Sequence, residues 1–212
     1  LTMDVASRTV ANYSSNGSTV TIGGITTVAG SIVAFDNAAV AATGAPIIIS
    51  GAITGAGNVS LSNSHNTTLA GINTYTGTTT LSAGNLTLSG STAAGSAFTM
   101  SGGTITGTGT VNGTMAISGG TIRLAGGATT SSLTFNQGVT FTNSPTVVFA
   151  TTTTPSTAYD VFGYGTGTVT GIANLKIGYR GTLTDDTVNK KYVFTTGAYG
   201  LTRTWNTTTG TW

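Results

Sequence analysis

Pairs of mostly apolar residues recur along this chain of 212 residues at intervals of about 18 positions. The members of each pair are two positions apart, and the pairs form two interleaved series. The first series contains Leu86/Leu88, Ile105/Gly107, Ile122/Leu124 and Val139/Phe141. The second contains Val59/Leu61, Thr79/Leu81, Phe98/Met100, Met115/Ile117 and Leu133/Phe135. Residues two apart lie on the same face of a β-strand, so each series predicts a stack of strands.

Two stacks with the same period indicate a chain that coils once per ~18 residues, so that equivalent residues of successive coils lie above one another. This predicts an all-β fold, a right-handed parallel β-helix whose interior is filled by the two series. Five or six coils, at the ~4.8 Å spacing of paired strands, would form a rod ~25–30 Å long.

The pattern divides the chain into three segments. Residues 1–45 contain short strand-like stretches and are predicted to form the first coils or a cap. Residues 46–144 contain the β-helix repeats. Residues 145–212 are predicted to form a C-terminal β cap or small β-sandwich, because the period is lost there and most Tyr and charged residues follow. Such a cap would cover the unpaired backbone of the last coil.

The composition excludes several classes of protein. The chain has 49 Thr, 32 Gly, no Cys and no Glu, and Arg123 is the only Asp, Lys or Arg between Asp36 and Asp160. A net charge of +2 predicts no nucleic-acid partner, and no run approaches the ~20 apolar residues needed for membrane insertion as a helix. A surface of hydroxyls and amides favours an extracellular or cell-surface location. The first residue is Leu1 rather than Met, which predicts a leader segment upstream.

One part of the repeat region resembles a known family. The stretches are Gly55-Ala-Gly-Asn-Val-Ser-Leu61, Gly71-Ile-Asn-Thr-Tyr-Thr-Gly-Thr-Thr-Thr-Leu81 and Ala83-Gly-Asn-Leu-Thr-Leu88. Together they resemble the autotransporter-associated β-strand repeat of bacterial surface proteins, and the Trp-containing ending Leu201–Trp212 is similar to segments of such proteins. The resemblance implies secretion, a β-helix and a surface role such as adhesion or display, and it implies no catalytic residue.

Enzymes that act on polysaccharides are the catalytic alternative for a β-helix. Glycoside hydrolysis usually requires two carboxyl groups that face each other across the sugar. None of the five Asp lies in the regular repeats, and the adjacent Asp185 and Asp186 are predicted to lie in a solvated turn. We therefore expect no catalytic residue.

The sequence also predicts no metal site and no cofactor. His65 is the only histidine and lies in a polar turn, where a solvated loop residue is the simpler interpretation. The calcium-binding solenoid repeats need Asp in every coil, and these are missing. Glycine runs such as Gly102-Gly103 have no following Lys, so they indicate coil corners rather than phosphate loops.

Two tryptophans near the end of the chain are the candidate subunit interface. Trp205 and Trp212 either fill the core of the cap or anchor this end on another copy, since Trp often concentrates binding energy at interfaces. The leading prediction is a non-catalytic extracellular structural protein, a subunit of a bacterial surface fibre or layer that self-associates through its ends. The alternative is an adhesin or passenger fragment that binds glycans or a host surface. A polysaccharide-active enzyme comes third.

Overall fold

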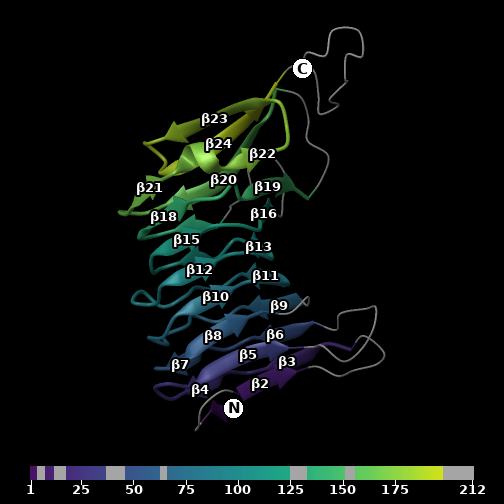
Figure 1. The fold of residues 1–212 in the computed structure, drawn as a ribbon, viewed down its shortest axis with the longest axis vertical. Helices are drawn as coiled ribbons and strands as arrows, with labels where there is room; N and C mark the ends of the chain where they lie inside the picture. Colours follow the sequence, from purple (N-terminus) through teal and green to yellow (C-terminus); the bar gives the residue numbers. More distant parts are fainter. Residues whose placement is uncertain are drawn as a thin grey trace.

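The structure is a computed structural model. It describes residues 1–3, 8–11, 18–36, 46–62, 66–124, 133–150 and 156–197. In these residues the regular structure is almost entirely β, and the one helical element is the short 3₁₀ turn η1 (Ile172–Asn174). The strands stack as successive coils of a parallel β-helix, which forms an elongated rod (Figure 1). The predicted all-β, β-helical fold class is therefore confirmed.

Two long parallel sheets, here called sheet I and sheet II, form two sides of the rod (Figure 1). Each holds eight strands among the described residues. Sheet I is formed by β2 (Arg8–Ala11), β5 (Ile32–Asp36), β8 (Asn58–Leu61), β10 (Thr79–Leu81), β12 (Phe98–Met100), β15 (Met115–Ile117), β18 (Gly138–Phe141) and β21 (Thr168–Thr170). Sheet II is formed by β3 (Val20–Ile22), β6 (Ile47–Ile49), β9 (Asn66–Leu69), β11 (Asn85–Leu88), β13 (Thr104–Gly107), β16 (Thr121–Leu124), β19 (Thr146–Phe149) and β22 (Lys176–Ile177).

A third side of the rod is formed by strands of two to seven residues. At one end lie β1 (Thr2–Met3), β4 (Ile25–Thr27) and β7 (Ile53–Gly55). At the other end lie β14 (Thr110–Val111), β17 (Thr134–Phe135), β20 (Ala158–Tyr164), β24 (Lys191–Thr196) and β23 (Gly181–Asp186). Isolated bridges link Ile72 to Ser91 and Ser91 to Thr110 of β14, and a backbone hydrogen bond from the Thr74 N–H to the Ile53 carbonyl continues the third side to β7. Each complete coil therefore contributes backbone pairing to three sides.

The strand register confirms most of the predicted apolar pairs. In sheet I the stacked residues are Val59, Thr79, Phe98 and Met115. In sheet II they are Leu86, Ile105 and Ile122. All of these side chains are at most 2 % exposed, so both series fill the interior as predicted. Burial of these stacked apolar groups is the main favourable contribution to the stability of the rod.

Gly107 occupies an interior ladder position where the neighbouring coil has Leu88. Its φ is +117°, a backbone conformation that residues with a side chain rarely adopt. A Cβ at this position would lie 2.0 Å from the carbonyl oxygen of Leu88. Glycine is therefore required here by both the backbone conformation and the close approach of the adjacent coil.

The final pair predicted for the first series is wrong. Val139 and Phe141 lie in sheet I, where they pair with Met115 and Ile117. The residue that pairs with Ile122 in sheet II comes later, in β19. The coil that follows β16 is longer than the four coils before it, so a fixed step of 17 residues selects the wrong strand.

The final pair predicted for the second series is also wrong. Phe135 pairs with Val111 on the third side of the rod and belongs to neither long sheet. Leu133 and Phe135 are nonetheless buried, at 2 % and 0 % exposed. The alternation of apolar residues correctly predicted an interior pair but assigned it to the wrong side.

The parallel pairing continues across both predicted segment boundaries. Strand β5 pairs with β8 across residue 45, and β18 pairs with β21 across residue 144. The two long sheets therefore hold eight strands each, because coils on both sides of residues 46–144 add to the five or six expected within that segment. Seven strand spacings place the outermost strands of one sheet about 34 Å apart.

An antiparallel extension of the third side covers the C-terminal end of the interior (Figure 1). Strand β24 pairs antiparallel with β20 on one side and with β23 on the other. The ring of Phe162 lies 5.4 Å from that of Phe135 and 4.9 Å from that of Tyr192, measured between centroids. A second cluster joins Phe149 to Tyr159 at 5.0 Å. The predicted β cap is thus continuous with the β-helix, and the described residues form no separate sandwich.

Candidate functional site

Several residues singled out in the sequence lie outside the described residues. These are the candidate interface residues Trp205 and Trp212, the only histidine, His65, and Asp4. Strand β5 includes Asp36, but the description does not extend to its side chain. The predictions made for these residues stay predictions.

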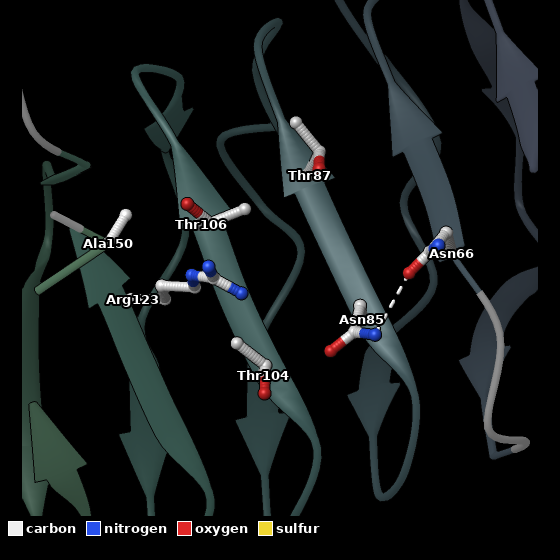
Figure 2. A pocket seen from close by; sticks show the side chains of 7 residues that line it. All are labelled: Asn66, Asn85, Thr87, Thr104, Thr106, Arg123 and Ala150. Carbon is white, nitrogen blue, oxygen red and sulfur yellow. Dashed lines mark hydrogen bonds between the residues drawn. The ribbon is translucent and has the colours of Figure 1, made fainter. Parts of the chain in front are cut away.

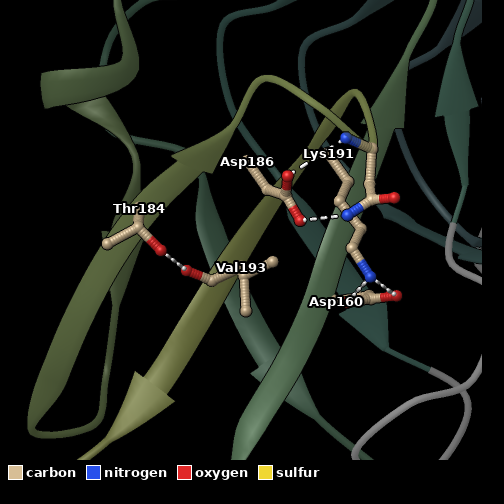
Figure 3. A network of polar contacts seen from close by, with 6 residues as sticks. Asp160, Thr184, Asp186, Lys191 and Val193 are labelled. Carbon is tan, nitrogen blue, oxygen red and sulfur yellow. Dashed lines mark hydrogen bonds and ion pairs between the residues drawn. The ribbon is translucent and has the colours of Figure 1, made fainter.

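The three remaining aspartates lie on the cap strands, and each has a polar partner. Lys191 Nζ lies 2.9 Å from a carboxylate oxygen of Asp160 (Figure 3). Tyr164 donates its hydroxyl to Asp185 at 2.6 Å. Asp186 accepts hydrogen bonds from the backbone and side chain of Asn189, at 3.0 and 2.8 Å.

These contacts shift two pKa values in the cap. The hydrogen bond to the Asp185 carboxylate stabilises the neutral phenol and raises the pKa of Tyr164 to about 12. The hydrogen bonds from Asn189 stabilise the carboxylate and lower the pKa of Asp186 below its ordinary value of 3.8.

The predicted position of Asp185 and Asp186 needs correction, because they are the last two residues of β23 and the turn follows them. Asp185 is exposed and Asp186 is half-buried. A hollow of about 270 Å³ beside them is lined by both signs of charge, including Asp160, Lys190 and Lys191. Among the described residues no three acidic, histidine or cysteine side chains are grouped to hold a metal ion.

A second hollow lies on the outer face of sheet II and crosses the strands. It measures about 320 Å³ and is here called the sheet II groove (Figure 2). Its lining residues come from five consecutive strands or their ends: Asn66, Asn85, Thr87, Thr104, Thr106, Arg123 and Ala150. Because the coils are in register, outward-facing residues form two rows along the rod.

The first row on this face contains amides followed by hydroxyls. Its members are Asn66, Asn85, Thr104, Thr121 and Thr146, of which the first three line the groove. Asn85 Nδ2 donates to Asn66 Oδ1 at 2.9 Å, so these two amides are oriented by each other. The second row contains Thr68, Thr87, Thr106, Arg123 and Val148. The face presents hydrogen-bond donors and acceptors at the regular spacing of the strands.

Arg123 is the charged residue of this groove. Its side chain is exposed, and its guanidinium lies over β13 between Thr104 and Thr106 (Figure 2). Within the described part of the chain it has no carboxylate partner. The sequence identified Arg123 as an isolated charge but not as part of a groove, because the groove is created by the stacking of separate coils.

The motif that carries the family resemblance has a structural role in this chain. Asn73 is 2 % exposed, and its Oδ1 accepts a hydrogen bond from the Ile53 N–H at 2.8 Å. Its Nδ2 donates to the carbonyl oxygens of Ser91 at 2.7 Å and of Gly71 at 3.2 Å. One side chain therefore connects the coil before it to the coil after it.

Tyr75 of the same motif is fully buried, and its hydroxyl forms a short hydrogen bond with that of Thr79. Burial raises the pKa of this phenol, so it remains neutral at physiological pH. Ser96 of the next coil donates to the carbonyl oxygen of Gly77 at 2.6 Å. Asn73 and Tyr75 are thus committed to the interior and to the contacts that hold the coils together.

Comparisons with models of protein families, with curated proteins and with solved structures found no match. The resemblance to the autotransporter-associated repeat therefore stays a prediction. No helix among the described residues is long and apolar enough to cross a membrane.

Proposed function

We propose that this chain is a non-catalytic, extracellular structural protein, a β-helical subunit of a bacterial surface fibre or layer. The observation that carries the proposal is the use of polar side chains to join one coil to the next. Asn73 spans three coils, and its partners are all backbone groups. A rod built in this way gains rigidity along its axis, because fully satisfied buried polar contacts hold successive coils in place.

Further polar contacts between coils support the same proposal. Asn58 Oδ1 accepts from the Thr78 N–H at 2.8 Å. Asn112 Nδ2 donates to the Thr92 carbonyl at 2.9 Å, while the Asn112 N–H donates to the Thr92 hydroxyl at 3.0 Å. Asn136 extends this chain of contacts to the next coil by donating to Asn112 Oδ1 at 3.3 Å.

The charge distribution also favours a structural role over catalysis. The three aspartates whose side chains are described lie on the cap and are bound to Lys191, Tyr164 and Asn189. They do not face one another across the sheet II groove, which is lined by hydroxyls, amides and one guanidinium. Two opposed carboxyl groups are what glycoside hydrolysis usually requires.

The architecture supports the proposed self-association through the ends. In the described sheets, β2 and β3 are the outermost strands at one end, and β21 and β22 are outermost at the other. An outermost strand has backbone groups available for pairing with a further strand. A contact between opposite ends is heterologous and generates a filament when the rotation does not close a ring. Trp205 and Trp212 are the proposed anchor of this contact.

Light scattering on three forms of the protein tests the proposal. The forms are the wild type, a chain truncated after Thr202, and a full-length double variant with Trp205→Ala and Trp212→Ala. We expect concentration-dependent polymers from the wild type and monomers from both altered chains, with circular dichroism unchanged. A wild type that stays monomeric at high concentration, or altered chains that polymerise equally well, would overturn the proposal.

A further inference from the structure

We propose that the sheet II groove binds a linear polysaccharide that carries carboxylate groups, with Arg123 as the carboxylate-binding residue. The inference goes beyond the structural role and does not depend on polymerisation. It rests on the shape of the groove, the chemistry of its lining, and the distribution of charge on this face.

The groove is long and runs across the strands. Its lining residues extend from Asn66 on β9 to Ala150 at the end of β19. Five strands at the usual spacing place these ends about 19 Å apart along the rod. A site of this length and shallow form suits an extended polymer that crosses several coils.

The lining has the hydrogen-bonding groups that suit sugars. Thr87, Thr104 and Thr106 supply hydroxyls that both donate and accept, and Asn85 and Asn66 supply amides. The bond between these two amides uses one NH₂ hydrogen of Asn85 and leaves its other NH₂ hydrogen, its carbonyl and the NH₂ group of Asn66 for a ligand. A guanidinium presents its donors in a planar fork that matches a carboxylate.

The charge on this face is complementary to a polyanion. Arg123 and Lys176 are its exposed cations, and Lys176 lies in the register row that contains Thr121 and Thr146. None of the described outward-facing residues of sheet II is acidic, because the described aspartates lie on the cap or in β5. The groove also lacks the aromatic platforms on which single-stranded nucleic acids stack.

The test uses polygalacturonate, alginate and hyaluronate as probes. Fully methyl-esterified polygalacturonate is the uncharged control for polygalacturonate. Binding is measured by calorimetry at protein concentrations where light scattering shows monomers, so failure here is distinct from failure to polymerise. The variants are Arg123→Gln and the matched control Arg180→Gln, which removes the same charge from an exposed site on the cap segment. Both changes are at exposed side chains, and thermal unfolding checks that the fold is retained.

We expect the wild type to bind at least one of the three uronate polymers and to bind the methyl ester at least about tenfold more weakly. Arg123→Gln should lower the affinity about tenfold or more, Arg123→Lys should restore part of it, and Arg180→Gln should change it less than about twofold. The proposal is overturned if no uronate polymer binds, or if the two Arg→Gln variants bind alike. It is also overturned if dextran sulfate binds wild type and Arg123→Gln equally and more tightly than the uronates, because that pattern indicates non-specific attraction.

Discussion

The side chain of Asn73 joins three coils through hydrogen bonds to backbone groups. It is buried, and it satisfies one backbone donor and two backbone acceptors in the coils around it. Asn73→Ala leaves the buried Ile53 N–H without its acceptor, so we expect the free energy of unfolding to fall by about 2–3 kcal/mol. The control is Asn85→Ala at an exposed amide, where we expect a change within about 0.5 kcal/mol. Urea denaturation measures both, and equal effects would contradict the assigned role of Asn73.

A substitution at Ile122 tests whether the stacked apolar residues of sheet II lie in the interior. It is 1 % exposed and pairs with Ile105 on one side and Val147 on the other. Ile122→Asp buries a charge with no partner, and we expect it to unfold the protein or to cost more than about 4 kcal/mol. Ala116→Asp places the same side chain at an exposed position and should leave the melting temperature nearly unchanged. A normal melting temperature for Ile122→Asp would show that the ladder is wrongly assigned.

The contact between Asp186, at the end of β23, and Asn189, in the turn before β24, makes the stability of the cap depend on pH. Asn189 holds the pKa of Asp186 below its ordinary value, so this contact stabilises the fold above the unfolded pKa and is lost as pH falls through the folded pKa. Asn189→Ala should raise the pKa of Asp186 toward 3.8, measured by NMR of the side-chain carboxyl carbon. Thr184→Ala is the control on the same strand, because the Thr184 hydroxyl bonds the Val193 carbonyl (Figure 3). An unchanged pKa in Asn189→Ala would refute the assigned cause.

The elements also show how far the sequence predicts this fold. The apolar alternation correctly predicted the strands from β8 to β15 in sheet I and from β11 to β16 in sheet II, since burial on one face imposes a period of two. It misplaced Val139 and Phe135 because interior pairs look alike in sequence, and the longer coil after β16 shifted their order. The third side before the cap was missed because β7, β14 and β17 have only two or three residues each and the coils between them pair through single bridges, as at Ser91.

The sheet II groove was missed for a different reason. Alternation identifies Asn85, Thr106 and Arg123 as outward-facing, but it does not reveal a hollow between coils. The groove depends on the register of five strands and on the direction taken by the Arg123 side chain (Figure 2). Once the register is known, the amide pair and the hydroxyl rows can be read from the sequence.

The whole rod should be stable without metal ions or disulfides. The chain has no cysteine, and the described residues contain no group of three metal-ligating side chains. Its stability is attributed to the apolar stacks and to the hydrogen bonds between coils. We expect the melting temperature to change by less than about 2 °C when a chelator or a reducing agent is added. A large decrease with chelator would instead indicate a calcium-dependent rod.

X-ray fibre diffraction of aligned wild-type polymer tests the central claim, that this chain is a β-helical subunit joined through its ends. The strands run across the rod and are spaced at ~4.8 Å along it, so subunits joined end to end keep this repeat parallel to the filament axis. We predict a strong reflection at ~4.8 Å on the meridian. A reflection at that spacing on the equator would mean that the rods associate side by side, and a protein that forms no filaments would contradict the claim altogether.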